Sequence, residues 1–247
     1  MNGNGRSLPW LVLAVLLISL CALIVLLSSS HRAAESYKIL AENAVSSAPV
    51  EPEKPAEPPV TVDWAALKAE NADVAAWLYC EGTPINYPVV QAYDNSSYLK
   101  RGFDGRDSEA GTLFFDSRND VALPDDNLII YGHQMYDDSM LGLLPEWAEY
   151  EYYEEHPVMY LLTPARSYRV ELFSCRLIEA KDWLFSTSFF DPGDYQIYLD
   201  RAVAQSYWQC DTPASADSPT LTLVTCSYYP YAKNPRLLLH GRMIPIE

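Results

Sequence analysis

Basic residues are scarce in this chain of 247 residues. Lysine and arginine together number 17, against 33 aspartates and glutamates, and the formal net charge is -16. Binding to nucleic acid depends on clustered lysine and arginine side chains that neutralise phosphates, and the sequence contains no such cluster. The composition therefore excludes nucleic acid as an expected partner.

Cysteine is also scarce, with five residues in the whole chain. They are Cys21, Cys80, Cys175, Cys210 and Cys226. None stands in a Cys-x-x-Cys spacing or close to a pair of histidines, so we expect no zinc site. A chain of this length can bury a core without disulfide bonds. The acidic pairs Asp125-Asp126 and Asp137-Asp138 are typical of solvated loops. We therefore expect no disulfide framework, no metal ion and no other cofactor.

One long run near the N-terminus lacks charge. Residues 8–27, LPWLVLAVLLISLCALIVLL, would form a helix about 30 Å long, the thickness of a bilayer core. The run is longer than the apolar part of a signal peptide, so the sequence predicts a membrane anchor over residues 1–30, with cleavage after Ala34 as the alternative. The positive-inside rule is ambiguous here. The size of the downstream domain favours a single-pass protein with a cytoplasmic N-terminus and an extracellular globular part.

Proline is concentrated after this run. The segment SSAPVEPEKPAEPPVTV, residues 46–62, is typical of an extended and semi-rigid spacer, so we expect a Pro-rich extracellular linker over residues 31–62. Residues 63–247 then form one domain. At its start, DWAALKAENADVAAWL has apolar residues near helical spacing and Asp63 as a possible N-cap, which predicts one or two amphipathic helices over residues 63–78.

Short β-type runs dominate the rest of the chain. They are separated by clusters of Asp, Asn, Gly and Pro, as in a sandwich or a barrel. The runs are INYPVVQ, GTLFFD, NLIIYGH, VMYLL, YRVELFSCRLIEA, TLTLVTC and RLLLHGRMI. Helical patterns over residues 140–156 and 191–209 interrupt them. The sequence thus predicts a mainly β domain with helical insertions.

Cys226 closes the run TLTLVTC, where a substrate could reach a thiol. A lone cysteine is most often an inert core residue, and that interpretation stands beside a catalytic one. Residues 227–235 form a return loop, so in an antiparallel hairpin Arg236 would fall opposite or close to Cys226. A guanidinium there would favour the thiolate and could stabilise an oxyanion. Arg242, further along the same run, would lie about 20 Å away.

A thiol catalyst also needs a proton donor, and the chain has four histidines. We expect His31 and His156 at the surface and His240 in a structural role. His133 follows a buried run at a strand-to-loop edge, where active sites commonly form. The residues alone leave His133 open between a structural and a catalytic role.

Together, these motifs resemble those of the sortases, the membrane-anchored cysteine transpeptidases of Gram-positive surfaces. The resemblance rests on TLVTC ending at Cys226, NPRLLLHGR containing Arg236, NLIIYGH ending at His133, DNSSYL and GTLFFDSRN. It covers about residues 63–246, and the His, Cys and Arg occur in the family's order. The helix-bearing insertion of residues 182–210 and the helical N-terminal extension indicate the class B branch.

The resemblance implies a closed, eight-stranded sortase β-barrel with N-terminal helices and a helical insertion before the Cys strand. Residues 63–247 would be the catalytic domain. Cys226 would be the nucleophile that attacks the Thr carbonyl of a C-terminal sorting signal. Arg236 would hold the oxyanion and position the substrate, and His133 would be the general acid and base. Substrate-lining positions of the family match Thr225, Asn95 and Leu99.

The implied partners are secreted surface proteins that carry a sorting signal, together with an amine of the peptidoglycan cross-bridge or of a pilin. Two positions depart from the class B pattern, which often has Ser at the place of Val224 and an acidic residue at the place of Ser227. These departures leave the signal open between NPxTx-like and SPxTx-like motifs. Two other functions remain as alternatives: a non-catalytic, membrane-anchored binding domain and a mainly hydrolytic cysteine peptidase. A papain-type peptidase does not fit, because its Cys begins a helix and precedes its His.

Overall fold

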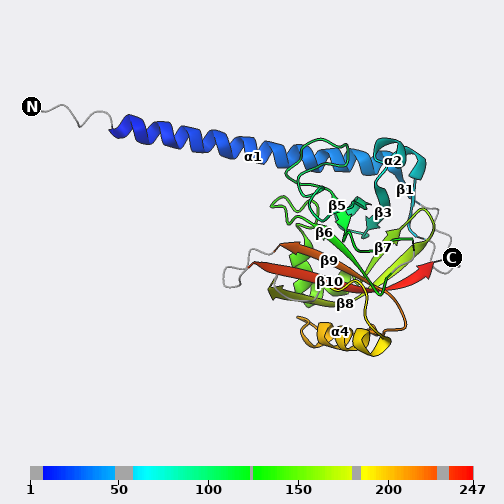
Figure 1. The fold of residues 1–247 in the computed structure, drawn as a ribbon. Coiled ribbons are helices and arrows are strands. Elements are labelled where there is room, and N and C mark those ends of the chain that lie inside the picture. The colour runs from blue at the N-terminus through cyan, green and yellow to red at the C-terminus, as the bar shows by residue number, and fades with distance from the viewer. Residues whose placement is uncertain (1–7, 48–57, 123–124, 180–184, 227–233, 247) are drawn as a thin grey trace, which may run out of the picture.

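Eight strands close into a barrel that carries helices on its outside (Figure 1). The computed structural model describes residues 8–47, 58–122, 125–179, 185–226 and 234–246; the side chains of residues 8–12, 22, 23, 25–30, 46, 47 and 226 lie outside this description. The barrel strands are β3 (Val74–Tyr79), β4 (Asn86–Val90), β5 (Leu113–Phe115), β6 (Asn127–Gly132), β7 (Val158–Leu162), β8 (Ser167–Glu179), β9 (Thr220–Cys226) and β10 (Pro235–Ile246). The closed barrel confirms the fold class predicted from the sequence.

The strands follow the order β10, β8, β7, β3, β4, β5, β6 and β9, and the pairing of β9 with β10 closes the ring. Neighbouring strands are antiparallel except for the parallel pairs β4 with β5 and β6 with β9. Strand β9 thus lies between β6 and β10. The three strands that carry the predicted His, Cys and Arg motifs are therefore neighbours in the sheet, although β6 is far from the other two in the sequence.

Alternating side chains on β9 belong to two different hydrophobic clusters. Leu221 and Leu223 lie in the main cluster, which draws residues from all eight strands and fills the barrel. Val224 lies in a second cluster together with Tyr198 and Leu199 of helix α4 (Pro192–Ala204), outside the barrel. Because successive side chains of a strand point to opposite faces, the even-numbered positions of β9 face outward.

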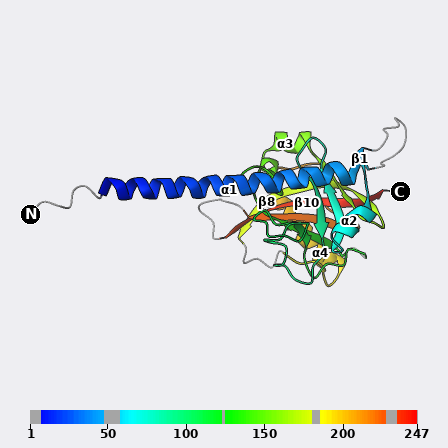
Figure 2. The ribbon, with the colours of Figure 1, turned by 90° about the horizontal axis from the view of Figure 1, so that it is seen from above.

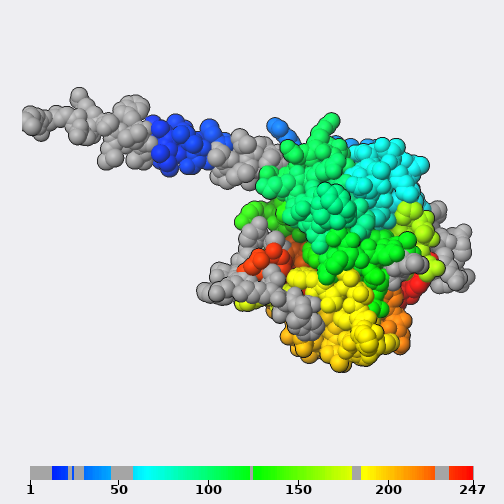
Figure 3. All heavy atoms as spheres, in the orientation of Figure 1, coloured from blue at the N-terminus to red at the C-terminus, as the bar shows by residue number. Residues whose placement is uncertain are grey.

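Helix α4 covers this outer face on the side of the barrel away from α1 (Figure 1), and it forms much of the yellow surface in Figure 3. The helix begins where the Asp191 carboxylate accepts hydrogen bonds from the backbone N–H groups of Gly193 (2.8 Å) and Asp194 (3.0 Å). Such an N-cap satisfies donors that have no partner within the helix. The predicted apolar face of the 191–209 segment is buried against the barrel at Tyr195, Tyr198, Leu199 and Ala202.

Of the two other segments predicted to be helical, one contains helices as expected and the other is helical only in its first half. Residues 140–156 contain the 3-10 helix η1 (Leu144–Ala148) and α3 (Tyr150–Glu155), as expected. Residues 63–78 are helical only in α2 (Trp64–Glu70), with Asp63 as the N-cap. The second half of that segment is strand β3, so the prediction of helix there was wrong. Trp77 in β3 is fully buried between partners on β4 and β7, and this sheet pairing outweighs the helical spacing.

Helix α1 (Leu8–Ala44) extends well beyond the apolar run from which a helix was expected. Its C-terminal part lies across the barrel and its N-terminal part projects away from it (Figures 1 and 2). Tyr37, Ala41 and Ala44 are buried within the main hydrophobic cluster. The last turns of α1 are therefore part of the folded domain.

The predicted single-pass membrane location, with a cytoplasmic N-terminus and an extracellular domain, was wrong. No helix within the described ranges combines the length and the apolar character needed to cross a bilayer. The apolar run does not end as an isolated segment. It continues in the same helix through charged residues such as Arg32, Glu35 and Lys38 to the part that packs on the barrel.

The segment expected to be an extended linker also contains regular structure. Residues 31–44 belong to α1, and β1 (Val45–Ser47) pairs in antiparallel fashion with β2 (Val60–Val62). This pairing brings the two ends of the Pro-rich stretch together. Its central residues, 48–57, lie outside the described residues.

Candidate active site

The end of β9 lies between the ends of two other strands that carry predicted site residues. Arg236 of β10 pairs directly with Cys226 of β9, as the hairpin argument predicts. On the other side, Gly132 of β6 pairs with Thr225 in a parallel ladder, so His133 follows at the level of Cys226. Neighbouring strands are about 4.8 Å apart, and residues at the same level point to the same face. The backbone register thus places His133, Cys226 and Arg236 at neighbouring strand ends.

The imidazole of His133 is held by a backbone carbonyl. Its Nε2 atom lies 2.6 Å from the carbonyl oxygen of Leu99, and because a carbonyl only accepts, Nε2 carries the proton. Within the described part of the chain, Nδ1 has no hydrogen-bond partner. The backbone of His133 is fixed as well, since its carbonyl accepts from the N–H of Leu141 at 3.0 Å. This arrangement leaves Nδ1 as the ring nitrogen that can exchange a proton.

The guanidinium of Arg236 is half-buried and anchored locally. Nη1 donates to Oδ1 of Asn234 at 2.8 Å and to the carbonyl of Pro235 at 3.0 Å. Asn234 has a φ of 51°, a left-handed conformation that Asn adopts more readily than most residues. The turn into β10 thereby orients Arg236 while leaving other guanidinium donors for a ligand. The side chain of Cys226 lies outside the described residues, and its backbone is paired with that of Arg236.

The three residues predicted to line the substrate groove have different environments. Thr225 is buried, on the same face of β9 as Leu221 and Leu223, and its hydroxyl has no partner among the described residues. The amide of Asn95 is occupied by neighbours: Nδ2 donates to the Asp116 carboxylate at 3.2 Å, and Oδ1 accepts from the N–H of Ser117 at 2.7 Å. The Leu99 side chain is 40% exposed, while its backbone contacts His133.

A buried carboxylate that contacts the Asn95 loop was not anticipated from the sequence. Asp116, just after β5, accepts from Arg118 through Nε and Nη2, both at 2.8 Å, and from the Tyr131 hydroxyl at 2.8 Å. Burial alone raises the pKa of Asp116, but the hydrogen bonds from Arg118 and Tyr131 outweigh it and the pKa lies below its usual value. The ionised Asp116 joins β5, β6 and the Asn95 loop. The only signal in the sequence was an aspartate directly after an apolar run.

His240 has the structural environment expected of it. Its Nδ1 lies 2.9 Å from the Thr222 hydroxyl and its Nε2 accepts from Nε of Arg176 at 3.2 Å. Because the Thr222 hydroxyl donates to Asn127 at 2.6 Å, it accepts from Nδ1 and the imidazole is neutral. Complete burial, together with the nearby Arg176 cation, lowers the pKa of His240 well below its usual value. The network ties β6, β9, β8 and β10 together beneath α4.

Within the described residues, no group of three or more His, Cys, Asp or Glu side chains could hold a metal ion. The site is built from a strand-end thiol position, an imidazole and a guanidinium.

Comparison with protein families matches residues 78–244 to the sortase domain. The chain therefore belongs to the sortase family. It is 28% identical to sortase B of Staphylococcus aureus over 182 residues, which are 74% of this chain and 75% of that relative. The crystal structure of sortase B from Bacillus anthracis is 30% identical, with a TM-score of 0.76 over 89% of this chain and 100% of that one. A Staphylococcus aureus sortase B–substrate complex is 28% identical, with a TM-score of 0.71 over 74% of this chain and 85% of the other.

These similarities make the chain a class B sortase, as the motifs indicated. It is a cysteine transpeptidase of the kind that anchors surface proteins to the cell wall.

Proposed function

We propose that Cys226 is the nucleophile of this transpeptidase and that it acts on a C-terminal sorting signal of the NPxTx or SPxTx type. The thiolate attacks the carbonyl carbon of the signal's Thr, and the carbonyl oxygen becomes an oxyanion. Collapse of this intermediate breaks the peptide bond after Thr and leaves a thioester on Cys226. The observation that supports the proposal is the register, which pairs Cys226 with Arg236 and pairs Gly132, the residue before His133, with Thr225.

Arg236 stabilises the oxyanion and positions the signal peptide. A fixed cationic donor is most effective when it is aimed at charge that develops in the transition state. The hydrogen bonds of Nη1 to Asn234 and Pro235 hold the guanidinium in place before substrate arrives, and this preorganisation supports the role.

His133 moves the proton in both halves of the reaction. The imidazolium donates a proton to the departing amine when the peptide bond breaks, and the neutral imidazole then takes a proton from the attacking amine. With Nε2 committed to Leu99, Nδ1 makes both transfers.

The acceptor is an amine of the peptidoglycan cross-bridge or of a pilin. It attacks the thioester carbonyl, a new amide bond forms, and Cys226 leaves as the thiolate. The similarity to a sortase B crystallised with its substrate supports a peptide signal as the first substrate. Thr225, Asn95 and Leu99 line the groove that takes the signal peptide, as their match to substrate-lining positions of the family implies.

Intact-mass and product analysis of the full chain tests this function. The chain is incubated with NPxTx and SPxTx peptides, with and without an amine, beside Cys226→Ala. We expect an acyl adduct on the wild-type chain that passes to the amine, and no adduct on Cys226→Ala. The absence of an adduct with every peptide, and a Cys226 that alkylates no faster than a free thiol, would leave a binding domain; release of peptide acid alone despite added amine would leave a hydrolase.

A further inference from the structure

We propose that Tyr37 of helix α1 is a positioning residue for His133, so that the docking of α1 forms part of the catalytic apparatus. The inference rests on the role of His133 in the proposed function. It follows from two chains of contacts that begin at the Tyr37 side chain and end at His133.

The first chain starts at the Tyr37 hydroxyl, which is buried with 3% of the residue exposed. Oη donates to the carbonyl of Gly111 at 2.5 Å, accepts from the N–H of Phe103 at 3.3 Å, and lies 2.9 Å from the Thr112 hydroxyl. Burial raises the pKa of Tyr37 to about 12, so the hydroxyl keeps its proton and remains a donor at neutral pH. One side chain of α1 thus fixes both ends of the 103–112 loop.

That loop lies directly against the backbone that holds His133. The N–H of Thr112 donates to the carbonyl of Tyr98 at 3.1 Å. Gly111 has a φ of +62°, and a Cβ placed there would lie 2.5 Å from the Tyr98 oxygen and 2.8 Å from the Leu99 oxygen. The next contact is the hydrogen bond between the Leu99 carbonyl and Nε2 of His133. Displacement of residues 111 and 112 would therefore move the acceptor that orients the imidazole.

The second chain runs through the ring of Tyr37. It meets the Tyr87 ring edge to face, with centroids 5.7 Å apart and an interplanar angle of 86°. The Tyr87 hydroxyl accepts from the N–H of Met140 at 3.1 Å. Met140 is buried with a φ of 56°, a strained conformation for a residue other than glycine, and its neighbour Leu141 donates to the His133 carbonyl. The loop that begins with His133 thus depends on Tyr87 and, through it, on Tyr37.

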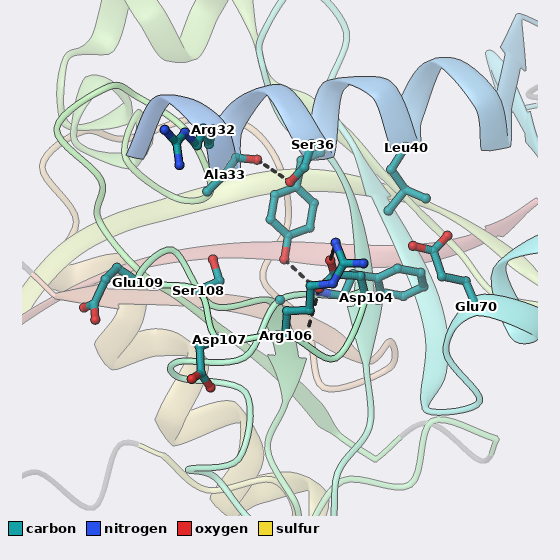
Figure 4. Close-up of a pocket in the computed structure, with 13 residues that line it drawn as sticks. Arg32, Ala33, Ser36, Leu40, Glu70, Asp104, Arg106, Asp107, Ser108 and Glu109 are labelled. Atoms are coloured by element: carbon teal, nitrogen blue, oxygen red, sulfur yellow. Dashed lines mark hydrogen bonds and ion pairs between the residues drawn. The ribbon is translucent and has the colours of Figure 1, made fainter. Parts of the chain in front are cut away.

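The packing around Tyr37 makes these contacts hard to replace. A cavity of about 470 Å³ lies between α1 and the loop of residues 102–109, and another of about 550 Å³ lies between α1 and the β3–β4 turn. Figure 4 shows Arg32, Ser36 and Leu40 projecting from α1 along the first cavity, opposite Asp104 and Ser108. Tyr37 lines both cavities. It therefore bridges helix and loops where the surrounding side chains leave space.

The test is Tyr37→Phe in the full chain, which removes the hydroxyl and keeps the ring. Imidazole ¹⁵N NMR shifts of His133 report the neutral tautomer, and steady-state transpeptidation reports kcat and KM. In the wild type we expect the Nε2–H tautomer. In Tyr37→Phe we expect mixed tautomers and a kcat lowered about tenfold, with KM changed less than about twofold, because misplacement of a catalytic group acts on the chemical steps.

Tyr195→Phe is the matched control. The Tyr195 hydroxyl is equally buried and makes the same kinds of contact, at 2.5 Å from the Asp126 carbonyl and 2.7 Å from the Thr220 hydroxyl, but at the opposite end of β9 from Cys226. It should lower thermal stability without changing the His133 tautomer or kcat. An unchanged tautomer in Tyr37→Phe, or the same loss of kcat in both variants, would overturn the inference.

Tyr87→Phe provides a second variant, should Tyr37→Phe fail to fold. It removes the acceptor for Met140 and should also perturb the His133 tautomer and kcat; no change in either would overturn the inference. His133→Ala separates the two proposals. If His133→Ala remains active, the proposed function fails, whereas the NMR result for Tyr37 still reports whether α1 positions the imidazole.

Discussion

Arg236 and Arg242 lie on the same strand and the same face, yet their partners on β9 differ. Arg236 pairs with Cys226 at the end of the strand, whereas Arg242 pairs with Thr220 at its beginning. The Arg242 Nε atom contacts the Ser218 hydroxyl at 3.3 Å. The chain thus contains a natural pair of arginines for testing which guanidinium serves the reaction.

Replacement of Arg236 by Lys should lower kcat/KM about 100-fold, because an ammonium keeps the charge but lacks the planar fork that holds an oxyanion and a peptide. Arg242→Lys should stay within about twofold of the wild type. Both are measured with the same signal peptide and amine. Equal losses in the two variants would assign the effect of Arg236 to the fold.

Among the candidate site residues, the sequence predicted the strand register but not the side-chain contacts. His133, Cys226 and Arg236 stand out because each occurs in a motif at a strand end, and their alignment follows from strand register. The contact between Nε2 of His133 and Leu99 could not be foreseen, because the acceptor is a backbone carbonyl and every residue has one. The burial of Asp116 could not be foreseen either, since its partner Tyr131 lies on β6 and reaches it only through the pairing of β5 with β6.

Helix α4 is the element that covers the outer face of β9 and β10, and its start depends on one side chain. Asp191→Ala removes the acceptor for two backbone N–H groups and should lower the free energy of unfolding by about 1 kcal/mol. Asp191→Asn should retain most of this stability. Urea denaturation measures both.

Asp200→Ala is the control on the same helix. Asp200 is exposed and accepts from Gln196 at 2.8 Å, so its removal should change stability by less than about 0.5 kcal/mol. If Asp191→Ala were as mild as this control, the cap would not determine where α4 begins.

Helices and strands were predictable from the sequence where the apolar residue pattern agrees with the way the segment packs in the fold. The β-branched run of β9 and the capped, amphipathic α4 follow from their residues alone. Residues 74–79 do not, because the apolar spacing near Trp77 suits a helix while burial between β4 and β7 requires a strand. Helix α1 shows the same limitation: the apolar run predicts a separate segment, and only the tertiary contacts of Tyr37, Ala41 and Ala44 reveal its attachment to the barrel.

The stability of the whole molecule should depend on pH through His240. Its pKa is lowered well below the usual value in the folded chain, while an unfolded His titrates near 6.5. Below about pH 6.5 the unfolded state binds a proton that the folded state does not, so the free energy of unfolding should fall by about 1.4 kcal/mol per pH unit until the folded pKa is reached. Above this pH range His240 is neutral in both the folded and the unfolded chain, so its titration no longer changes the free energy of unfolding.

Urea denaturation at about pH 7, 6 and 5 measures this slope. His240→Asn should be less stable at pH 7, because it loses the contact with Arg176, but it should show a shallower decline on acidification. Parallel pH curves for the two proteins would mean that other groups dominate the acid response.

The position of β9 between β6 and β10 also determines when the molecule can react. The parallel pairing of β6 with β9 joins distant parts of the sequence, and such contacts form slowly during folding because a long loop must first close. Until β9 is inserted, the thiol of Cys226 has neither the strand of His133 nor that of Arg236 beside it. If Cys226 acts as proposed, a newly made chain would carry an ordinary cysteine, and the thiol would become reactive only when the barrel is complete.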